Sequence, residues 1–258
     1  YSEELAPLAV RNYAEISTAD YLEGFNFTQV DGREVLGMPL EAYAARRELA
    51  WLREGVRKAG RQGMAVAFYP INTRAAVLLA PMDPDYGLRR TDGILLIVLP
   101  DIKVETDMLT AAIVYGDYGC FTIGAGTGRA GGFCGGLEGA MIESVVCGMA
   151  GWMCYRNVIN GVGVRPVGPR IATSLHVNPL ANWASSVVCQ VFNTKYHTIL
   201  YSGGYSLSGP GTETALVERA LFSVEIPING CNVSYPRKAQ AQANAAQTPL
   251  EAEFAWEI

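Results

Sequence analysis

The sequence predicts an α/β fold, a (β/α)8 TIM barrel, and three observations carry this prediction. Short apolar runs alternate with longer segments of helical spacing along the chain. Such alternation indicates parallel strands that are joined by crossover helices. Several of the runs are almost entirely apolar, as expected of strands that are covered on both faces. The length of 258 residues suits one such barrel, so we expect a single domain over residues 1–258.

Each element is predicted from its own pattern of apolar residues. The strands are expected at 21–29, 64–69, 94–99, 120–123, 171–176, 198–202 and 231–235. The helices are expected at 40–59, 104–115, 137–157, 181–194, 213–223 and 237–257. In the helix at 40–59, Leu49 and Leu52 recur on an apolar face, while Arg46 and Glu54 cover another face. Seven strands are one short of a barrel, so a first strand is expected to precede Tyr1.

Composition narrows the class of protein. Apolar residues make up 50% of the chain and charged residues only 17%, which indicates large interfaces, so we expect a homo-oligomer. A net charge of −5 without any basic block argues against nucleic acid as a partner. No apolar run reaches the ~18 residues of a membrane span. The six cysteines form no C-x-x-C motif, and we expect a protein of the reducing cytoplasm without membrane contact.

A glycine-rich stretch at 121–136 contains Gly126, Gly128 and Gly131 at the spacing of a dinucleotide-binding fingerprint. That fingerprint also needs an acidic residue about 20 positions later to hold the ribose. After Glu143, however, no acidic residue occurs before Glu213. We therefore expect no nucleotide here. We interpret the stretch as a loop at the end of a strand, where glycine lets the backbone approach a ligand or a partner closely.

Two segments resemble the monomethylamine methyltransferase family. Residues 31–66 contain a predicted helix followed by "AGRQGMAV", and residues 198–220 contain a "GPGTE" step between a strand and a helix. The resemblance extends over most of the chain, to about residue 245. It implies a TIM barrel and the transfer of a methyl group from methylamine to the cobalt of a separate corrinoid protein, the cobalamin cofactor being carried by that partner. It also implies that residues 1–258 are the central part of a longer chain.

The sequence departs from this family where the family's chemistry resides. The position that matches the family's pyrrolysine is Ala67, in "GMAVAFYP". Family carboxylates fall opposite Leu95 and Phe121, and a family glutamine falls opposite Gly203. An alanine methyl group cannot capture an amine as the imine of pyrrolysine does. We therefore expect this chain to have the barrel fold of the family. The identity of the family's substrate, in contrast, does not carry over to this chain.

Three functions remain open on this basis. The first is a methyltransferase without pyrrolysine, which would take a methyl group from a small methylated amine, betaine or sulfonium. The second is a non-catalytic homologue that acts as a subunit or binding protein in a larger assembly, and the loss of the matching residues favours it. The third is a TIM-barrel enzyme of unrelated chemistry, because a fold alone does not fix a function.

Candidate site residues follow from the rule that TIM barrels place function at the carboxyl ends of their strands. We expect His176, Asn178 and Tyr205 to be catalytic, with His176 as a base or hydrogen-bond donor, although a strand-end histidine is equally placed for the core. The expected substrate-binding residues are Phe68, Asn72, Arg74, Phe121, Tyr201, Ser208 and Glu213. Aromatic faces attract methylated ammonium groups by about 2 kcal/mol when desolvated. Any single aromatic residue is also a candidate for core packing.

The remaining expectations concern the barrel mouth and its loops. Gly126, Gly128 and Gly131 would give the corrinoid of the partner room to approach. No metal site is expected, because the two histidines are 21 positions apart and have no acidic residue near them. Thr212 is expected to cap the helix that begins at Glu213.

Overall fold

The computed structural model describes residues 5–24, 29–68, 80–132, 134–166, 179–203, 206, 208, 212–234 and 249–258. The chain divides into two compact units. The first unit comprises Tyr1–Leu96 and Val104–Ile123, and the second comprises Ile97–Lys103 and Gly124–Ile258. A single domain over 1–258 stays a prediction.

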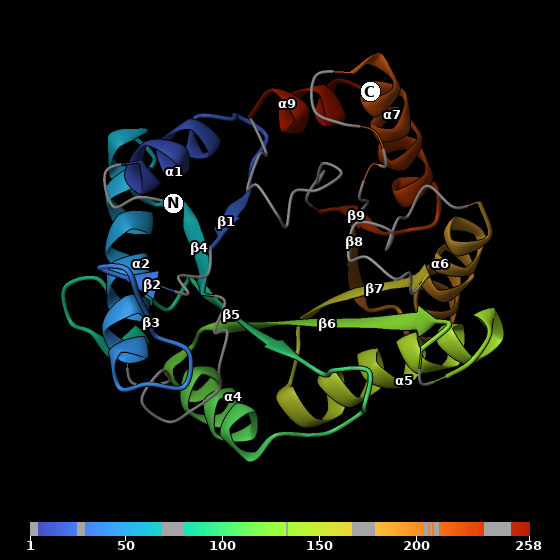
Figure 1. The fold of residues 1–258 in the computed structure, drawn as a ribbon, viewed down its shortest axis with the longest axis horizontal. Coiled ribbons are helices and arrows are strands. Elements are labelled where there is room, and N and C mark those ends of the chain that lie inside the picture. Colours follow the sequence, from blue (N-terminus) through green and yellow to red (C-terminus); the bar gives the residue numbers. More distant parts are fainter. Residues whose placement is uncertain are drawn as a thin grey trace. The chain divides into compact units, whose positions relative to one another are not determined.

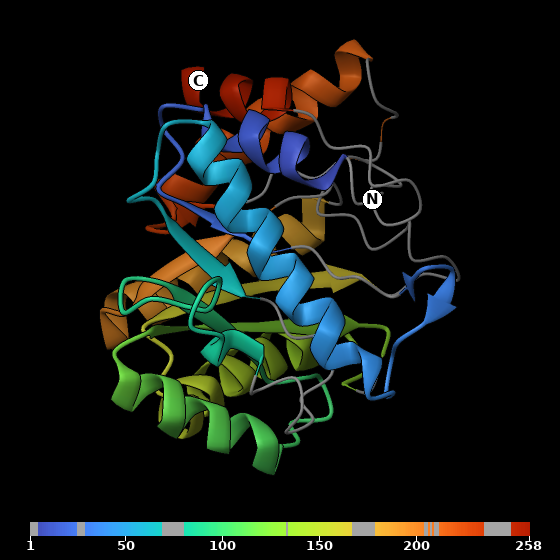
Figure 2. The ribbon, with the colours of Figure 1, turned by 90° about the vertical axis from the view of Figure 1, so that its left-hand side faces the viewer.

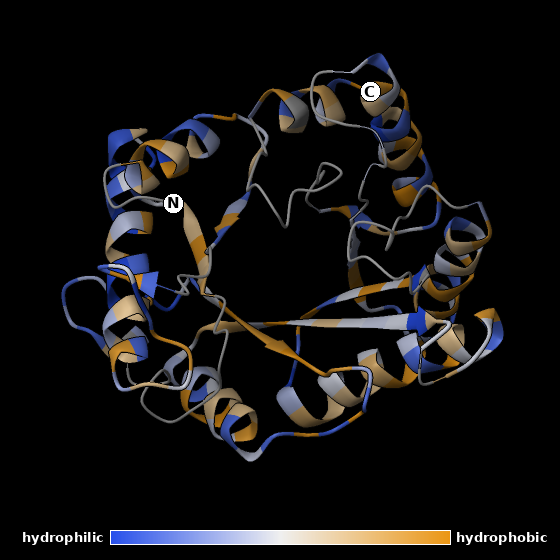
Figure 3. Cartoon of the chain, viewed as in Figure 1, coloured by the Kyte–Doolittle hydropathy of each residue, from blue (hydrophilic) through white to orange (hydrophobic). Residues whose placement is uncertain are grey.

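The first unit contains a parallel sheet of short strands (Figure 1). Its elements are α1 (Ala6–Ala14), β1 (Tyr21–Glu23), β2 (Gln29–Val30), β3 (Arg33–Glu34), α2 (Leu40–Lys58), β4 (Ala65–Phe68), a 3-10 turn (Ala80–Met82), nearly all of β5 (Gly93–Ile97) and α4 (Thr106–Tyr118). β4 pairs in parallel with both β1 and β5, while β2 and β3 form a small antiparallel pair. β5 is hydrophobic over most of its length (Figure 3), in agreement with the predicted two-sided burial.

The long helix α2 packs against α1, as Figure 2 shows. The two helices approach closely at Gly55, where a Cβ atom would lie 2.4 Å from the Cβ of Val10. The apolar stripe of α2 includes Leu49 and Leu52, both of which are fully buried. The amphipathic spacing that predicts this helix thus describes its packing face correctly.

A buried ion pair connects α2 to the sheet of the first unit. The carboxylate of Asp92, which is fully buried, pairs with the guanidinium of Arg53 on α2. The same carboxylate accepts hydrogen bonds from the backbone N–H of Val66 at 3.0 Å and from the backbone N–H of Arg89. Asp92 therefore links α2, the strand β4 and the turn before β5 through one charged group. Because the carboxylate is buried, water could not replace these contacts if Asp92 were removed.

The second unit contains the later strands and helices of the chain. Its elements are most of β6 (Phe121–Ala130), α5 (Leu137–Tyr155), β7 (Ile159–Pro166), α6 (Pro179–Val191), a π-helical turn (Phe192–Tyr196), β8 (Ile199–Ser202), α7 (Glu213–Ile228), β9 (Asn232–Val233) and α9 (Pro249–Glu257). The strand order is β6-β7-β8-β9, and β8 pairs in parallel with β7 and β9. None of the helices that the structure describes combines the length and the hydrophobicity of a membrane span.

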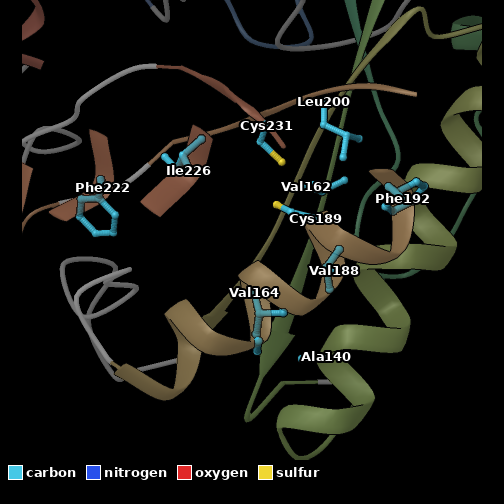
Figure 4. Packing of buried hydrophobic residues seen from close by; sticks show 11 residues of the cluster. Ala140, Val162, Val164, Val188, Cys189, Phe192, Leu200, Phe222, Ile226 and Cys231 are labelled. Carbon is cyan, nitrogen blue, oxygen red and sulfur yellow. The ribbon is translucent and has the colours of Figure 1, made fainter. Parts of the chain in front are cut away.

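The core of the second unit is apolar and lies between its strands and helices. Figure 4 shows Val162 and Val164 of β7 and Leu200 of β8 beside residues of α6 and α7. Cys189 and Cys231 belong to the same buried cluster and are both free thiols. A hydrogen bond with Cys189, and then burial, raise the pKa of the Cys231 thiol, which keeps it neutral. These cysteines behave as small core residues, in line with the sequence-based interpretation.

Strand β7 was not predicted, and its structure explains why. Its sequence "INGVGVRP" carries two glycines and polar residues instead of an apolar run. Two successive backbone amides of β7 donate to helix side chains: Gly163 N–H to Oγ of Ser144 at 3.1 Å, and Val164 N–H to Oγ of Ser185 at 2.9 Å. Serine hydroxyls of α5 and α6 thus anchor this strand, and hydrophobic periodicity cannot reveal such bonds. The strand predicted at 171–176 lies outside the described residues.

Most other predicted elements are confirmed with shifted ends. The helices α2, α4, α5, α6 and α7 overlap their predicted ranges, and α7 continues to Ile228 beyond the predicted end at 223. Thr212 caps α7 by accepting the Ala215 N–H at 3.3 Å, as predicted. Of the helix predicted at 237–257, α9 covers Pro249–Glu257, and the part before it lies outside the described residues.

The interpretation of the glycine-rich stretch as a loop was wrong for Gly126 and Gly128, which lie inside β6. A Cβ atom at Gly126 would lie 2.6 Å from the Cβ of Cys147, and one at Gly128 would lie 1.8 Å from the carbonyl oxygen of Ala140. Both contacts are with α5, so these glycines let the helix lie close on the strand. Gly131 follows the strand with φ of +86°, a left-handed conformation that favours glycine.

Gly128→Ala is expected to lower the free energy of unfolding by about 1–3 kcal/mol, because the new methyl group meets backbone atoms of α5 that cannot rotate away. Urea denaturation measures the change. Gly63→Ala is the matched control, since a Cβ atom there meets no atom within 4 Å; its effect should stay below about 1 kcal/mol. Equal losses in the two variants would contradict the packing role of Gly128.

Candidate functional site

Three residues of the first unit stand in register on neighbouring parallel strands. Glu23 of β1 pairs with Ala67 of β4, and Ala67 pairs with Gly93 of β5. Residues that face each other in register on paired strands point to the same side of a sheet. Glu23 therefore shares a face with Ala67, the position that is expected from the sequence to match pyrrolysine. The Gly24 N–H donates to the carbonyl oxygen of Ala67 at 2.7 Å and holds the two strand ends together.

Two aromatic rings lie on the same face. A Cβ atom at Gly93 would lie 2.5 Å from Cε2 of Phe121, so the Phe121 ring covers Gly93. The rings of Tyr21 and Phe121 meet edge to face, with centroids 6.2 Å apart and an interplanar angle of 79°. Tyr21 is two positions before Glu23 in β1 and so projects to the same side. We name Tyr21, Glu23, Ala67, Gly93 and Phe121 the aromatic–acid cluster.

A second carboxyl group lies near the end of β1. Glu48 of α2 is only 3% exposed, and a Cβ atom at Gly24 would lie 1.9 Å from its Oε1 atom. Burial, and then the nearby charge of Glu23, raise the pKa of Glu48 well above its usual range. Glu48 therefore favours its neutral form more than an exposed glutamate does. The negative charge of Glu23 contributes to this upward shift of the Glu48 pKa.

Burial also keeps the phenol of Tyr21 neutral. Desolvation is the largest cause that raises its pKa, and the charges of Glu23 and Asp20 add to it. The cluster therefore presents one carboxylate, one phenol and one phenyl ring. This combination suits a small cation, because a carboxylate attracts its charge and aromatic edges and faces contact its methyl groups.

Of the predicted site residues of the first unit, some lie at the aromatic–acid cluster and others do not. Phe121 belongs to the aromatic–acid cluster together with Ala67. Phe68 is adjacent to Ala67 in β4 and therefore projects to the opposite face, where it is 1% exposed. Asn72 and Arg74 lie outside the described residues.

The predicted site residues of the second unit lie at several places. Tyr201 of β8 is buried, and its ring covers Gly161 of β7. Ser208 donates from its N–H and its hydroxyl to Glu218 of α7, at 3.1 and 3.0 Å. Glu213 is exposed in the first turn of α7. His176, Asn178 and Tyr205 lie outside the described residues.

Sequence reasoning missed Glu23, Tyr21 and Glu48. The alternation of Tyr21, Leu22 and Glu23 within a predicted strand could have placed the phenol and the carboxylate on one face. Glu48 interrupts the apolar stripe of α2 between Ala45 and Leu49, and an acidic residue at such a position is a signal of a buried carboxyl group. Among the described residues, no three His, Cys, Asp or Glu side chains gather as metal ligands do.

Comparison with solved structures defines the fold class of the chain. The chain is similar over 99% of its length to the crystal structure of the Methanosarcina barkeri monomethylamine methyltransferase MtmB, with a TM-score of 0.85, 21% identity and 55% of that chain covered. A hydroxylamine complex of MtmB gives a TM-score of 0.81, also at 21% identity, with the same coverage of both chains. The Escherichia coli homocysteine methyltransferase MmuM gives 0.56 at 11% identity, over 98% of this chain and 85% of that one. These likenesses confirm the predicted α/β TIM-barrel class.

Sequence comparison then identifies the family. The model of the family "Monomethylamine methyltransferase MtmB" matches residues 1–258, and the chain belongs to this family. It is 25% identical over 261 aligned positions to the monomethylamine methyltransferase MtmB2 of Methanosarcina acetivorans, covering all of this chain and 56% of that protein. The chain thus spans about half the length of the relatives that it matches.

Proposed function

We propose that the chain is the barrel part of a methyltransferase that works without pyrrolysine and moves a methyl group from a small methylated cation to the cobalt of a corrinoid protein. Membership of the family supports the reaction class. The observation that carries the substrate class is the register of Glu23 with Ala67 and the two aromatic rings on the same face. No cofactor is assigned to this chain, since the corrinoid belongs to the partner protein.

The proposed roles follow from charge and shape. A quaternary ammonium or a sulfonium is already an activated leaving group and needs no capture as an imine. The carboxylate of Glu23 would attract its charge, and the rings of Tyr21 and Phe121 would contact its methyl groups. The partner's corrinoid would supply the nucleophile that accepts the methyl carbon, and the bonding electrons would stay on the departing nitrogen or sulfur. The residues of this chain would therefore act mainly by orientation.

His176, Asn178 and Tyr205 remain proposed catalytic residues, and Phe68, Asn72, Arg74, Tyr201, Ser208 and Glu213 remain proposed substrate contacts. The role of Gly131 in the approach of the corrinoid also stays a proposal. For Gly126 and Gly128, the contacts with α5 supply an alternative reason for glycine.

The experiment combines the full-length protein, a reduced corrinoid protein and a panel of methylated amines, betaines and sulfonium compounds. The cobalt absorption spectrum reports methyl-cobalt formation. Turnover with quaternary or sulfonium donors, and not with monomethylamine, would support the proposal. Methyl-cobalt formation with none of the donors would favour the non-catalytic alternative, a subunit or binding protein in a larger assembly.

The outer face of α7 supports the expectation of a homo-oligomer. Val217, Leu221, Val224 and Ile228 are 44–76% exposed and recur every three or four residues, so they form one stripe along the helix. The later charged residues of this helix do not interrupt the stripe: Glu218 and Arg219 are buried, and Glu225 accepts the hydroxyl of Ser186 at 2.8 Å. A stripe of this kind is self-complementary under a two-fold axis, which makes a second copy of the chain the proposed partner.

Leu221→Glu is expected to shift the full-length protein toward a smaller assembly in light scattering at micromolar concentration, because a charge in an apolar interface is left without a partner. Leu8→Glu on α1 is the control, since Leu8 is similarly exposed on a helix of the first unit. An unchanged mass for Leu221→Glu, or a wild-type protein that is already a monomer, would contradict the proposal.

A further inference from the structure

Two buried cysteines of the second unit face each other between a helix and the last strand. Cys189 lies near the end of α6 and Cys231 directly precedes β9; they are 3% and 4% exposed, and both thiols are free. Figure 4 shows their sulfur atoms directed toward each other within the apolar cluster. The thiol of Cys231 donates a hydrogen bond to the sulfur of Cys189, so the two side chains are in contact.

Two other buried cysteines have partners of a different kind. The Cys120 thiol donates to the backbone oxygen of Arg89 at 3.2 Å, and the Cys147 thiol donates to the backbone oxygen of Leu99 at 3.5 Å. The contact between Cys189 and Cys231, in contrast, joins two thiols from distant parts of the chain. A disulfide requires two cysteines that are close in space and whose side chains point toward each other.

A small cavity adjoins Cys189. It lies between α6, β8 and α7, and its internal volume is about 20 Å³. Such a volume holds roughly one or two water molecules, and hydrogen peroxide is a neutral molecule of similar size. Cys231 is not among the described residues that line this cavity. Cys189 is therefore the thiol that a small oxidant in the cavity would meet first.

We infer that Cys189 and Cys231 are a site of reversible disulfide formation by hydrogen peroxide, independent of the proposed methyl transfer. The Cys189 sulfur attacks one peroxide oxygen, the O–O bond breaks, and water leaves with the thiol proton, which gives a sulfenic acid. The Cys231 sulfur then attacks the Cys189 sulfur, the S–S bond forms, and the sulfenic oxygen leaves as a second water with the Cys231 proton. Two thiols are thereby oxidised, and one peroxide is reduced to two waters.

The disulfide has a structural consequence for the second unit. It joins α6 to the start of β9 and encloses residues 190–230, which include β8 and α7. A cross-link around a segment of this length restricts the unfolded chain and thus raises the stability of the folded one. Where thiol reductants prevail, such a disulfide forms transiently, as redox-sensing disulfides do.

The test treats the full-length protein with hydrogen peroxide, blocks the remaining thiols under denaturing conditions and maps the tryptic peptides by mass spectrometry. Trypsin leaves Cys189 on residues 171–195 and Cys231 on residues 220–237, with no other cysteine on either peptide. We expect these two peptides to be joined, with the loss of two hydrogen atoms, and to separate on reduction with dithiothreitol. We also expect oxidation to raise Tm by about 2–6 °C and reduction to reverse the rise.

Variants locate the response. Cys189→Ala and Cys231→Ala are each expected to abolish the joined peptides and the rise of Tm. Cys120→Ala is the matched control and should keep both, since Cys120 is also buried but contacts a backbone carbonyl. If a variant of the pair does not fold, the peptide map of the wild type decides. Absence of the joined peptides from the oxidised wild type, or a rise of Tm that persists in both variants of the pair, would overturn the inference.

Discussion

Glu23→Gln in the full-length protein is expected to lower kcat/KM for methyl transfer from a quaternary or sulfonium donor by about 10- to 100-fold. Unit charges about 6 Å apart attract by about 3 kcal/mol at an effective dielectric constant of about 20, and glutamine keeps the shape while it removes the charge. The measurement is the initial rate of methyl-cobalt formation at several donor concentrations. Thermal unfolding should change little, because Glu23 is only partly buried at the end of β1.

Glu48→Gln is the matched control for this prediction. Burial and the nearby Glu23 hold the pKa of Glu48 above its usual range, so glutamine replaces an acid that favours its neutral form. We expect its kcat/KM to stay within about threefold of the wild type. A large loss in Glu48→Gln combined with no loss in Glu23→Gln would show that the charge assignment within the pair is reversed.

Asp92→Ala is expected to lower the free energy of unfolding by about 3–5 kcal/mol, the largest stability effect in the first unit. The variant leaves the guanidinium of Arg53, which is 10% exposed, without its carboxylate. It also removes the acceptor for the backbone N–H groups of Val66 and Arg89. Chemical denaturation monitored by circular dichroism measures the change, because the helices and strands of both units contribute to that signal.

The control for Asp92→Ala is an exposed ion pair on a helix. Glu15 pairs with Arg11 at 2.7 Å, and both side chains are nearly half exposed. Solvent screens such a pair, so Glu15→Ala should cost less than about 1 kcal/mol. A loss for Asp92→Ala that is no larger than the loss for Glu15→Ala would contradict the role of Asp92 as the anchor between α2 and the sheet.

Local patterns predict the helices of this chain better than its strands. The stripe at 40–59 identifies α2 almost to the residue, because an amphipathic helix of 19 residues repeats its signal over five turns. β7 has no such signal, since its glycines and polar residues are stabilised by serine hydroxyls of the flanking helices. β6 was predicted too short for a similar reason. Glycines there reflect the close approach of α5 rather than a loop.

The candidate site could be predicted only in part from the sequence. Phe121 was expected at the site, and it contributes a ring to the aromatic–acid cluster. Glu23 could not be placed beside Ala67 from the sequence alone, because that neighbourhood depends on the register between β1 and β4. A shift of one residue would send Glu23 to the opposite face. Register is a property of paired strands, and 44 positions separate these two residues along the chain.

We propose that this family member transfers a methyl group from a methylated cation without pyrrolysine. The most direct test is a single-turnover reaction of the full-length protein, produced in a host that cannot make pyrrolysine. Each reaction contains reduced corrinoid protein and one donor labelled with ¹³C in the methyl group: tetramethylammonium, trimethylsulfonium or monomethylamine. We expect a ¹³C-methyl-cobalt resonance with tetramethylammonium or trimethylsulfonium, and a rate about 10- to 100-fold lower in Glu23→Gln. Labelled methyl-cobalt from monomethylamine alone, or from no donor, would contradict it.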